Sequence, residues 1–276
     1  MNVWLQQVLP QHALSRLVLA ATRVRTAWFK NAMIGAFLKS FPVDLAEAIQ
    51  SDPRGFESFN AFFTRALREG VRPIAPAAAD LASPVDGTVS ECGRIDGETL
   101  LQAKGRSYSL PDLLAGQDWA ARFAGGTFAT IYLAPFNYHR IHMPISGNLL
   151  DCVYVPGRLF SVNEATARAV PRLFARNERV LTRFDSVAGQ FALVLVGALN
   201  VGSMATVWAG DITPRRPRIL TRLPNAHVTL AKGAELGRFN MGSTVILLFE
   251  SGRTRWDDFL RRGTTLHYGQ RIGKVS

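Results

Sequence analysis

The sequence predicts an α+β protein with amphipathic helices at its N-terminus and a mostly antiparallel, β-rich, sandwich-like body. Up to residue 38 the apolar side chains recur every three or four positions, which is the period of a helix. Beyond Ile74 the apolar runs shorten and turn residues multiply between them, which is typical of strands joined by turns. A chain of 276 residues can bury a full core without disulfides or metal ions.

The composition indicates a globular protein with an anionic partner. The net charge of +11 leaves nucleic acid and acidic phospholipid as candidates. The apolar content of 47% favours lipid, and no common nucleic-acid-binding module is visible, so we expect no nucleic-acid partner. Cys92 and Cys152 are too few for a disulfide framework and lack the spacing of metal ligands, which favours a reducing cytoplasm.

The N-terminal region, residues 1–45, is predicted to associate with a membrane. Its helical pattern runs from Val3 to Leu38 with a break near Pro10, and it contains five lysines or arginines but no acid before Asp44. Cationic amphipathic helices with Trp and Phe are typical of interfacial anchors. No apolar run reaches transmembrane length, so we expect a peripheral protein on the cytoplasmic face of the cell membrane. The alternative is a helical hairpin that covers the core or forms a homodimer interface.

The body, residues 46–276, is predicted to form the catalytic domain. A helix is expected from Phe56 to Leu67, with Ser58 as its cap and the aromatic side chains packed on one face. Shorter helices are expected at Leu110–Leu114 and Ala165–Phe174. The expected strands are Thr88–Val89, Thr127–Leu133, Leu149–Val155, Arg179–Phe184, Phe191–Val196, Met204–Ala209, Ala226–Leu230 and Val245–Phe249.

The last of these runs begins just after a glycine–serine pair. Five adjacent apolar residues between polar ends predict a buried strand, with Ser243 at its mouth. Gly242 admits backbone angles that other residues avoid, so the Ser243 hydroxyl could approach the Gly242 carbonyl in a geometry suited to attack. A turn serine that opens a strand is the simpler interpretation.

Three separated motifs resemble the phosphatidylserine decarboxylase family. They are the segments Ser83–Val89, Tyr138–Pro144 and Asn240–Thr244. In the third segment family members usually carry Leu-Gly-Ser-Thr, and here Met241 replaces the leucine. Phe62–Arg65 and Phe160–Asn163 are similar to further family segments, the second of them near the substrate. The resemblance extends from about Phe59 to Phe249.

The resemblance implies a proenzyme that cuts itself between Gly242 and Ser243. Asp86 would orient His142, and His142 would withdraw the proton of the Ser243 hydroxyl, which attacks the Gly242 carbonyl and converts the amide to an ester. β-Elimination then leaves dehydroalanine at position 243, which hydrolyses to a pyruvoyl group with release of ammonia. The products are a long chain, 1–242, and a short chain, 243–276.

The resemblance also implies that this covalent pyruvoyl group is the cofactor for decarboxylating phosphatidylserine to phosphatidylethanolamine in phospholipid biosynthesis. Its ketone forms a Schiff base with the serine headgroup and accepts the electrons left when carbon dioxide departs. His139 is the candidate for the acid that protonates the carbanion. Asn137 stands where some family members place an acid, so a second carboxylate in the relay is missing or supplied elsewhere.

Other functions are open at the level of the residues. A serine hydrolase could use Asp86, His142 and Ser243 against an external ester, and a non-catalytic membrane-binding module would need none of them. His139 and His142 are three residues apart but have no third ligand at a telling distance, so no metal site is expected. Three arginines could meet lipid phosphate or form a solvated basic face: Arg158, Arg168 and Arg172.

Overall fold

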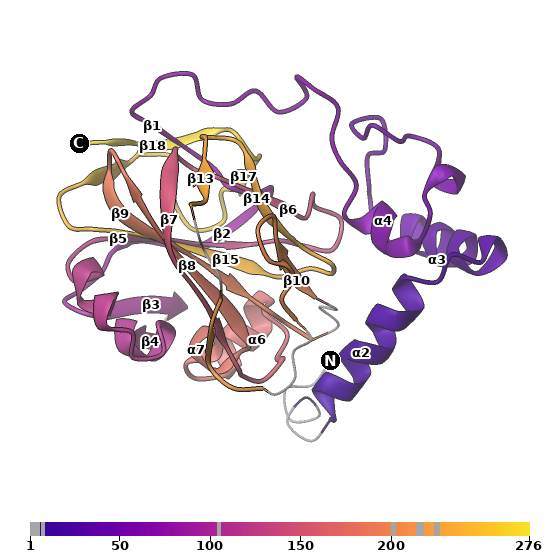
Figure 1. Cartoon of the computed structure of the whole chain (residues 1–276), viewed down its shortest axis with the longest axis horizontal. Coiled ribbons are helices and arrows are strands. Elements are labelled where there is room, and N and C mark those ends of the chain that lie inside the picture. The colour runs from indigo at the N-terminus through magenta and orange to yellow at the C-terminus, as the bar shows by residue number, and fades with distance from the viewer. Residues whose placement is uncertain (1–5, 7–8, 104–105, 200–202, 214–217, 224–226) are drawn as a thin grey trace.

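The computed structural model describes residues 6, 9–103, 106–199, 203–213, 218–223 and 227–276 (Figure 1). A sheet-rich body carries two longer helices at one side, α2 (Gln11–Thr22) and α3 (Ala27–Ser40), next to the short helix α4 (Phe59–Phe63). The prediction of an α+β fold with N-terminal helices is confirmed. The boundary predicted between residues 45 and 46 stays a prediction.

The N-terminal helices present apolar side chains to the outside. Helix α2 starts after Pro10, as predicted, while residues 3–5, 7 and 8 of the expected pattern lie outside the described residues. The buried side of α2 is mainly polar, since it consists of Gln11, Ser15, Leu19 and Thr22. Leu17 on α2 and Trp28 on α3 are 67% and 73% exposed. In the part of the chain that the structure describes, no helix has both the length and the apolar character to span a bilayer.

The helix predicted from Phe56 to Leu67 is wrong in its extent, because α4 ends at Phe63. The predicted cap is confirmed, since the Ser58 hydroxyl oxygen accepts a hydrogen bond from the Ala61 amide at 3.1 Å. After α4 the chain extends, and Leu67 forms a β-bridge with Ala48, which excludes a helical conformation there. The aromatic residues pack against α3 in a cluster of their own: Phe56, Phe59, Phe62 and Phe63 with Ile34.

The body is organised around a nine-stranded antiparallel sheet with the order β12-β7-β8-β9-β15-β5-β2-β17, in which β13 also pairs with β7. Its strands are β2 (Gly87–Arg94), β5 (Thr127–Tyr132), β7 (Gly147–Val155), β8 (Arg179–Ser186), β9 (Gly189–Val196), β12 (Thr221–Arg222), β13 (Thr229–Leu230), β15 (Thr244–Phe249) and β17 (Thr265–Leu266). The strand that follows Ser243 is therefore central, between β9 and β5.

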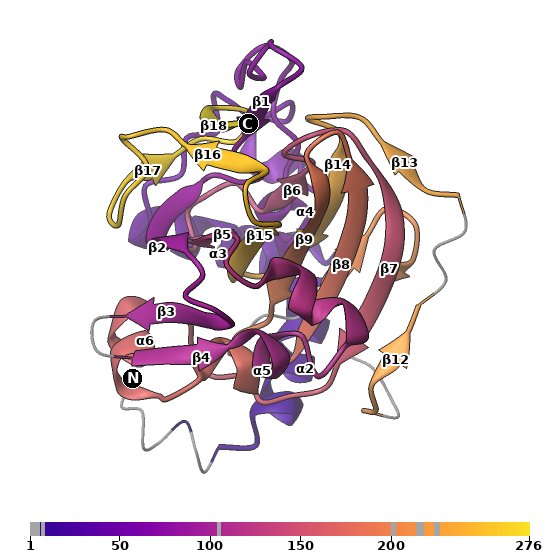
Figure 2. The same ribbon diagram turned by 90° about the vertical axis from the view of Figure 1, so that its left-hand side faces the viewer.

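Smaller elements cover both faces of this sheet. One face packs against a three-stranded sheet, β1 (Asp80–Ala82), β18 (Arg271–Val275) and β16 (Thr254–Trp256), and a four-stranded sheet, β11 (Gly210–Asp211), β10 (Met204–Thr206), β14 (Glu235–Phe239) and β6 (Arg140–His142). The other packs against β3 (Thr99–Ala103), β4 (Arg106–Ser109), α5 (Leu110–Leu113), the 3-10 helix η2 (Asp118–Phe123), α6 (Glu164–Ala169) and α7 (Leu173–Arg176). Figure 2 shows the three-stranded sheet above the central strands and β3, β4 and α5 below them.

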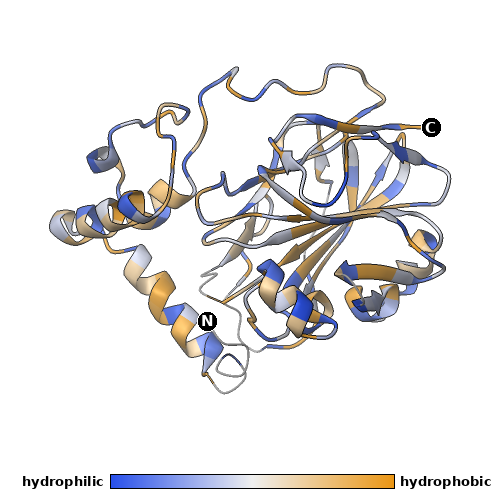
Figure 3. Ribbon diagram, turned by 180° about the vertical axis from the view of Figure 1, so that it is seen from behind, coloured by the Kyte–Doolittle hydropathy of each residue, from blue (hydrophilic) through white to orange (hydrophobic). Residues whose placement is uncertain are grey.

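The alternation of side chains along β15 explains its unbroken apolar run. Val245, Leu247 and Phe249 belong to one core, and Ile246 and Leu248 belong to the other. Figure 3 shows apolar residues concentrated along the central strands. A strand in this position holds its first residues rigidly, which fixes the place of Ser243.

Most of the predicted elements are confirmed with shifted ends. The strand expected at Met204–Ala209 stops at Thr206, because residues 207–209 form a turn. The helix expected at Ala165–Phe174 divides into α6 and α7, because Arg172 takes a left-handed conformation with φ of 52°. Of the strand expected at Ala226–Leu230 only β13 is formed among the described residues, and residue 226 lies outside them.

Candidate active site

The Gly242–Ser243 junction lies buried at the start of β15. Ser243 has no exposed surface, and its hydroxyl donates a hydrogen bond of 2.6 Å to the carbonyl of Val196 at the end of β9. The Ser243 carbonyl accepts a hydrogen bond of 2.9 Å from the Leu133 amide just after β5. The serine is thus held from both neighbouring strands, as expected for a residue at the mouth of a central strand.

His139 is the imidazole that lies beside this junction. Its Nδ1 is 2.7 Å from the Asn137 carbonyl, which only accepts, so Nδ1 carries the proton and Nε2 has a free lone pair. A Cβ placed on Gly242 would lie 3.2 Å from that Nε2. The ring is fully buried, packs 4.1 Å from the Phe63 ring between centroids, and its Nε2 has no hydrogen-bond partner among the described residues.

Burial sets the protonation state of His139. The pKa of the imidazole is lowered to about 3, mainly by burial; the hydrogen bond to the Asn137 carbonyl raises it, and the positive charge of Arg65 lowers it. The ring is therefore neutral at pH 7. It can accept a proton at Nε2 on the side that faces the Gly242–Ser243 junction.

His142 lies at the end of β6 with both ring nitrogens engaged. Its Nδ1 donates to the Gly233 carbonyl at 2.8 Å, so its Nε2 accepts from the Tyr138 hydroxyl at 2.9 Å. The ring stacks on Tyr268 at 3.8 Å between centroids. Burial lowers the pKa of this imidazole as well. The basic nitrogen of His142 therefore reaches other groups through the Tyr138 hydroxyl.

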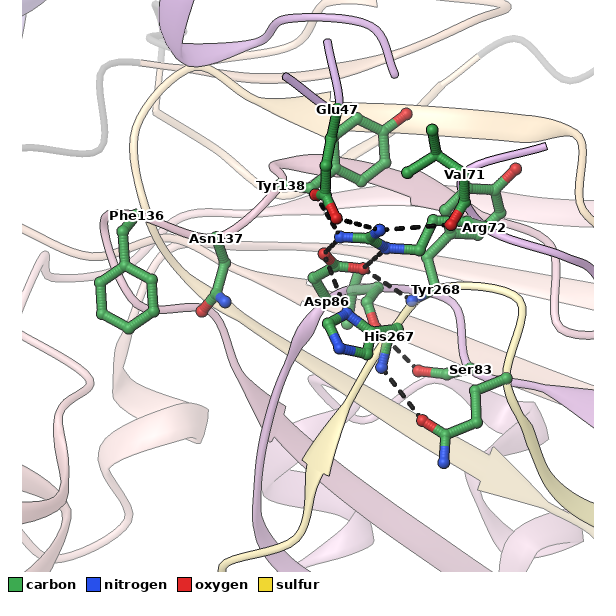
Figure 4. Close-up of polar contacts among 12 residues, drawn as sticks. Glu47, Val71, Arg72, Ser83, Asp86, Phe136, Asn137, Tyr138, His267 and Tyr268 are labelled. Atoms are coloured by element: carbon green, nitrogen blue, oxygen red, sulfur yellow. Dashed lines mark hydrogen bonds and ion pairs between the residues drawn. The ribbon is translucent and has the colours of Figure 1, made fainter. Parts of the chain in front are cut away.

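Asp86 is the buried centre of an ionic network (Figure 4). Its carboxylate accepts a hydrogen bond of 2.8 Å from Arg72, and the same guanidinium bridges to Glu47 at 2.7 and 2.8 Å. The Tyr268 amide donates to Asp86 at 2.7 Å, and His267 Nδ1 is 3.6 Å away. These partners fix the direction of the carboxylate.

The structure connects the predicted relay residues only in part. Tyr268 joins Asp86 to His142, since its amide bonds the carboxylate and its ring stacks on the imidazole. No hydrogen bond among the described residues connects His142 with Ser243, whose hydroxyl points to the Val196 carbonyl. The relay from Asp86 through His142 to Ser243 stays a prediction, and it requires these side chains to reorient.

Sequence reasoning missed several residues of this site, among them Tyr138, Arg72, Tyr268 and Glu47. Tyr138 is part of the histidine motif, so its position beside His142 could have identified it. Arg72 and Tyr268 carry no local signal, because they are 14 and 182 residues away from Asp86 along the chain.

A cavity of about 250 Å³ opens on the junction. Gly242 and Met241 form part of its wall, together with Phe63 of α4 and two aromatic residues from the end of α3, Phe37 and Phe41. Ser161 and Val162 also line it. That Phe160–Asn163 lies near the substrate stays a prediction. Its lining is mainly apolar, so it can hold an uncharged, lipid-like part of a ligand.

The remaining candidates do not join this site. Arg168 and Arg172 form exposed ion pairs with Glu164 and Asp112, as expected for a solvated basic face, and Arg158 lies over the Phe160 ring. Among the residues that the structure describes, no three His, Cys, Asp or Glu side chains gather as metal ligands.

The amino-acid sequence matches a known protein family. The sequence profile described as phosphatidylserine decarboxylase matches residues 59–274, which include every candidate catalytic residue, and a second profile, PSD, matches residues 1–42. The chain belongs to the phosphatidylserine decarboxylase family. Membership of this family confirms the prediction that the chain is an enzyme, a decarboxylase of the lyase class.

Bacterial members of the family match along nearly the whole chain. A protein of Pseudomonas fluorescens strain Pf-5 is 50% identical over 273 residues, which are 97% of this chain and 95% of its own. A protein of Methylococcus capsulatus is 48% identical over 272 residues, 98% of this chain and 94% of its own. A protein of Pseudomonas aeruginosa is 49% identical over 270 residues, 96% of this chain and 93% of its own. All three are named phosphatidylserine decarboxylase proenzyme.

Proposed function

We propose that this chain decarboxylates phosphatidylserine to phosphatidylethanolamine with a pyruvoyl group that it makes by cutting itself between Gly242 and Ser243. The observation that carries the proposal is the buried, unpartnered Nε2 of His139, which faces this junction at the end of an apolar cavity. Membership of the phosphatidylserine decarboxylase family supports the same activity. The alternative of a hydrolase for an external ester has no support from the relatives.

Self-cleavage would start from the Ser243 hydroxyl. Its oxygen must leave the Val196 carbonyl and attack the Gly242 carbonyl, and an imidazole must take its proton. His142 is the proposed base, with its proton path through Tyr138 and its orientation set by Asp86 through Tyr268. The Asp86 carboxylate, held by Arg72 and the Tyr268 amide, would stabilise the imidazolium that forms.

The surroundings of residue 243 fit a pyruvoyl group. When formed, the group supplies an electron-withdrawing carbonyl that accepts the electron pair left by carbon dioxide. The full burial of Ser243 keeps bulk solvent from this position, while the cavity at Gly242 gives a path for the water that formation of the group would consume. The apolar cavity leaves room for the lipid beside Gly242, and Nε2 of His139 is free to transfer a proton there.

His139 is the proposed proton donor of the decarboxylation. Because burial lowers its pKa to about 3, the neutral ring is a weak base, and once it has taken up a proton it is a strong acid. The hydrogen bond to the Asn137 carbonyl keeps the proton-transferring nitrogen, Nε2, directed at the junction. At pH 7 the ring holds no proton at Nε2, so His139 would first take one up there from solvent that reaches the cavity and then deliver it to the substrate carbon.

The two chains formed by cleavage would remain one body. The short chain would contain β15, β16, β17 and β18, and three of these pair with strands of the long chain. Strand β15 pairs with β5 and β9, β17 pairs with β2, and β18 pairs with β1. Cutting one peptide bond leaves these ladders and both cores intact, so the long and short chains stay partners.

The N-terminal helices are the proposed contact with an anionic membrane at the cytoplasmic face. Helix α2 buries a mainly polar side and leaves Leu17 exposed, and α3 leaves Trp28 exposed. Exposed apolar side chains beside arginines are typical of a helix at a lipid surface. A homodimer through the same helices would cover Leu17 and Trp28 instead, and analytical ultracentrifugation with and without detergent would distinguish the two.

The proposed function is tested by combining gel electrophoresis with an activity assay on phosphatidylserine vesicles. We expect the chain to appear as two fragments and to release carbon dioxide, and Ser243→Ala to stay whole and inactive. His142→Ala should also stay whole, whereas His139→Ala should be cut normally and decarboxylate slowly. A chain that stays whole and still releases carbon dioxide would contradict the proposal.

A further inference from the structure

A second cavity, of about 600 Å³, lies on the other side of α4 from the cavity at Gly242. Asn60, Ala61 and Thr64 line it, whereas Phe63 faces the cavity at Gly242, and the two cavities share no lining residue. Five arginines line the second cavity, which we call the arginine cavity: Arg23, Arg25, Arg65, Arg140 and Arg238.

The arginine cavity carries an excess of positive charge. Within the described residues its five guanidinium groups share only three carboxylates. The ion pairs are Arg23 with Asp211 at 2.5 Å, Arg25 with Glu57 at 3.1 Å, and both Arg140 and Arg238 with Glu235 at 2.8 and 3.3 Å. A concave site in which guanidinium groups outnumber carboxylates attracts anions from solution.

Arg65 has none of these carboxylates as a partner. The residue is 6% exposed, one terminal nitrogen donates to the Phe136 carbonyl at 3.2 Å, and its Nε has no hydrogen-bond partner among the described residues. Burial lowers the pKa of this guanidinium, yet arginine keeps its charge in proteins. The charges of Asp86 and Glu47 act on Arg65 and raise its pKa, but both carboxylates are paired with Arg72. Arg65 therefore has no ion pair of its own among the described residues, and a ligand could supply one.

We propose that the arginine cavity is a binding site for a phosphate group, carried by a lipid headgroup or by a soluble phosphate compound. Guanidinium groups match phosphate because their planar donors bond two oxygens at once. A volume of about 600 Å³ leaves room for the group that carries the phosphate. The site is separate from the cavity at Gly242, so phosphate and substrate can be bound together.

The surroundings of the arginine cavity favour the lipid source. Ile49 forms part of the cavity wall and is 70% exposed. Arg23 and Arg25 lie between α2 and α3, the helices that expose Leu17 and Trp28, and Figure 1 shows α2, α3 and α4 together at one side of the body. Exposed apolar side chains beside a phosphate site are what a protein needs at the headgroup level of a membrane.

The first measurement is calorimetric titration of the full-length protein with inorganic phosphate. We expect Arg65→Gln and Arg238→Gln to bind phosphate about tenfold more weakly than the unchanged chain, since each removes one charged hydrogen-bonding partner. Arg25→Gln changes an exposed side chain, so it can replace Arg65→Gln in the test if that buried variant misfolds. The matched control is Arg255→Gln on β16, which removes the same charge from a side chain that is 73% exposed and lines a different surface.

The second measurement is sedimentation with vesicles of phosphatidylcholine that contain phosphatidylglycerol. If the arginine-cavity variants weaken vesicle binding more than Arg255→Gln does, the phosphate belongs to a lipid. If they weaken only the binding of inorganic phosphate, the site serves a soluble phosphate compound. Phosphate affinity that is absent, or equal in all variants, overturns the proposal. Neither measurement needs chain cleavage, so both can be repeated on Ser243→Ala and do not depend on the proposed activity.

Discussion

Adding one methyl group at the junction tests where His139 lies. A Cβ at Gly242 would be 3.2 Å from Nε2 of His139 and 3.3 Å from the Leu133 carbonyl oxygen, which is closer than ordinary contact. Neither neighbour moves freely, because His139 is bonded to the Asn137 carbonyl and the Leu133 amide is bonded to Ser243. Gly242→Ala should therefore shift the junction by a few tenths of an ångström and destabilise the fold by about 1–3 kcal/mol.

A displacement of this size should slow self-cleavage about tenfold, because a misplacement of about 1 Å costs about a hundredfold in rate. The assay follows the appearance of the two fragments on a denaturing gel after cell-free synthesis, beside thermal unfolding. Gly35→Ala on α3 is the control, because a Cβ there meets nothing within 4 Å and should leave cleavage unchanged.

A double variant separates the clash from other effects of alanine at Gly242. His139→Ala removes the ring, so the unfolding penalty of Gly242→Ala should become smaller in the His139→Ala background. Equal penalties in both backgrounds, or normal stability and cleavage of Gly242→Ala, would refute the placement of His139 beside the junction.

Three further outcomes are expected. In chemical denaturation, Arg72→Met should lower the free energy of unfolding by about 3 kcal/mol, because it leaves two carboxylates without their counter-ion. The control Arg255→Met, at an exposed site, should change it by less than about 0.5 kcal/mol. The free energy of unfolding should fall as the pH drops from 6.5 toward 3, because His139 binds a proton in the unfolded chain but not in the folded one, where its pKa is about 3. In His139→Leu this loss of stability should be smaller by a few kcal/mol. Identical slopes of stability against pH in the two proteins would contradict the neutral, buried ring. Tyr138→Phe should fold, but its self-cleavage should be about tenfold slower, because Nε2 of His142 loses its only hydrogen-bond donor among the described residues. A normal rate of fragment formation would remove Tyr138 from the proton path.

The sequence predicted those parts of the fold that have one dominant cause. The run Val245–Phe249 is apolar at every position because both faces of β15 are buried, and the cap at Ser58 follows from its hydroxyl. The hairpin β3–β4 and the strand β14 were missed, because alternation with polar or charged residues such as Gln102 and Arg238 hides their buried positions.

The site was predicted in its residues more than in its contacts. Asp86, His139 and His142 were found through their motifs, but motif order does not state which imidazole lies beside Gly242. Tertiary contacts decide this, since packing against Phe63 and a carbonyl bond direct His139 to the junction. The partners that fix Asp86 come from remote segments, so no local pattern marks them.

The most direct test of self-cleavage is the intact mass of the purified protein. We expect two chains, one ending at Gly242 and one of 243–276 that is lighter than the unmodified fragment by one ammonia, because the serine amine is lost when the pyruvoyl group forms. A single species with the mass of all 276 residues that still decarboxylates phosphatidylserine would contradict the account.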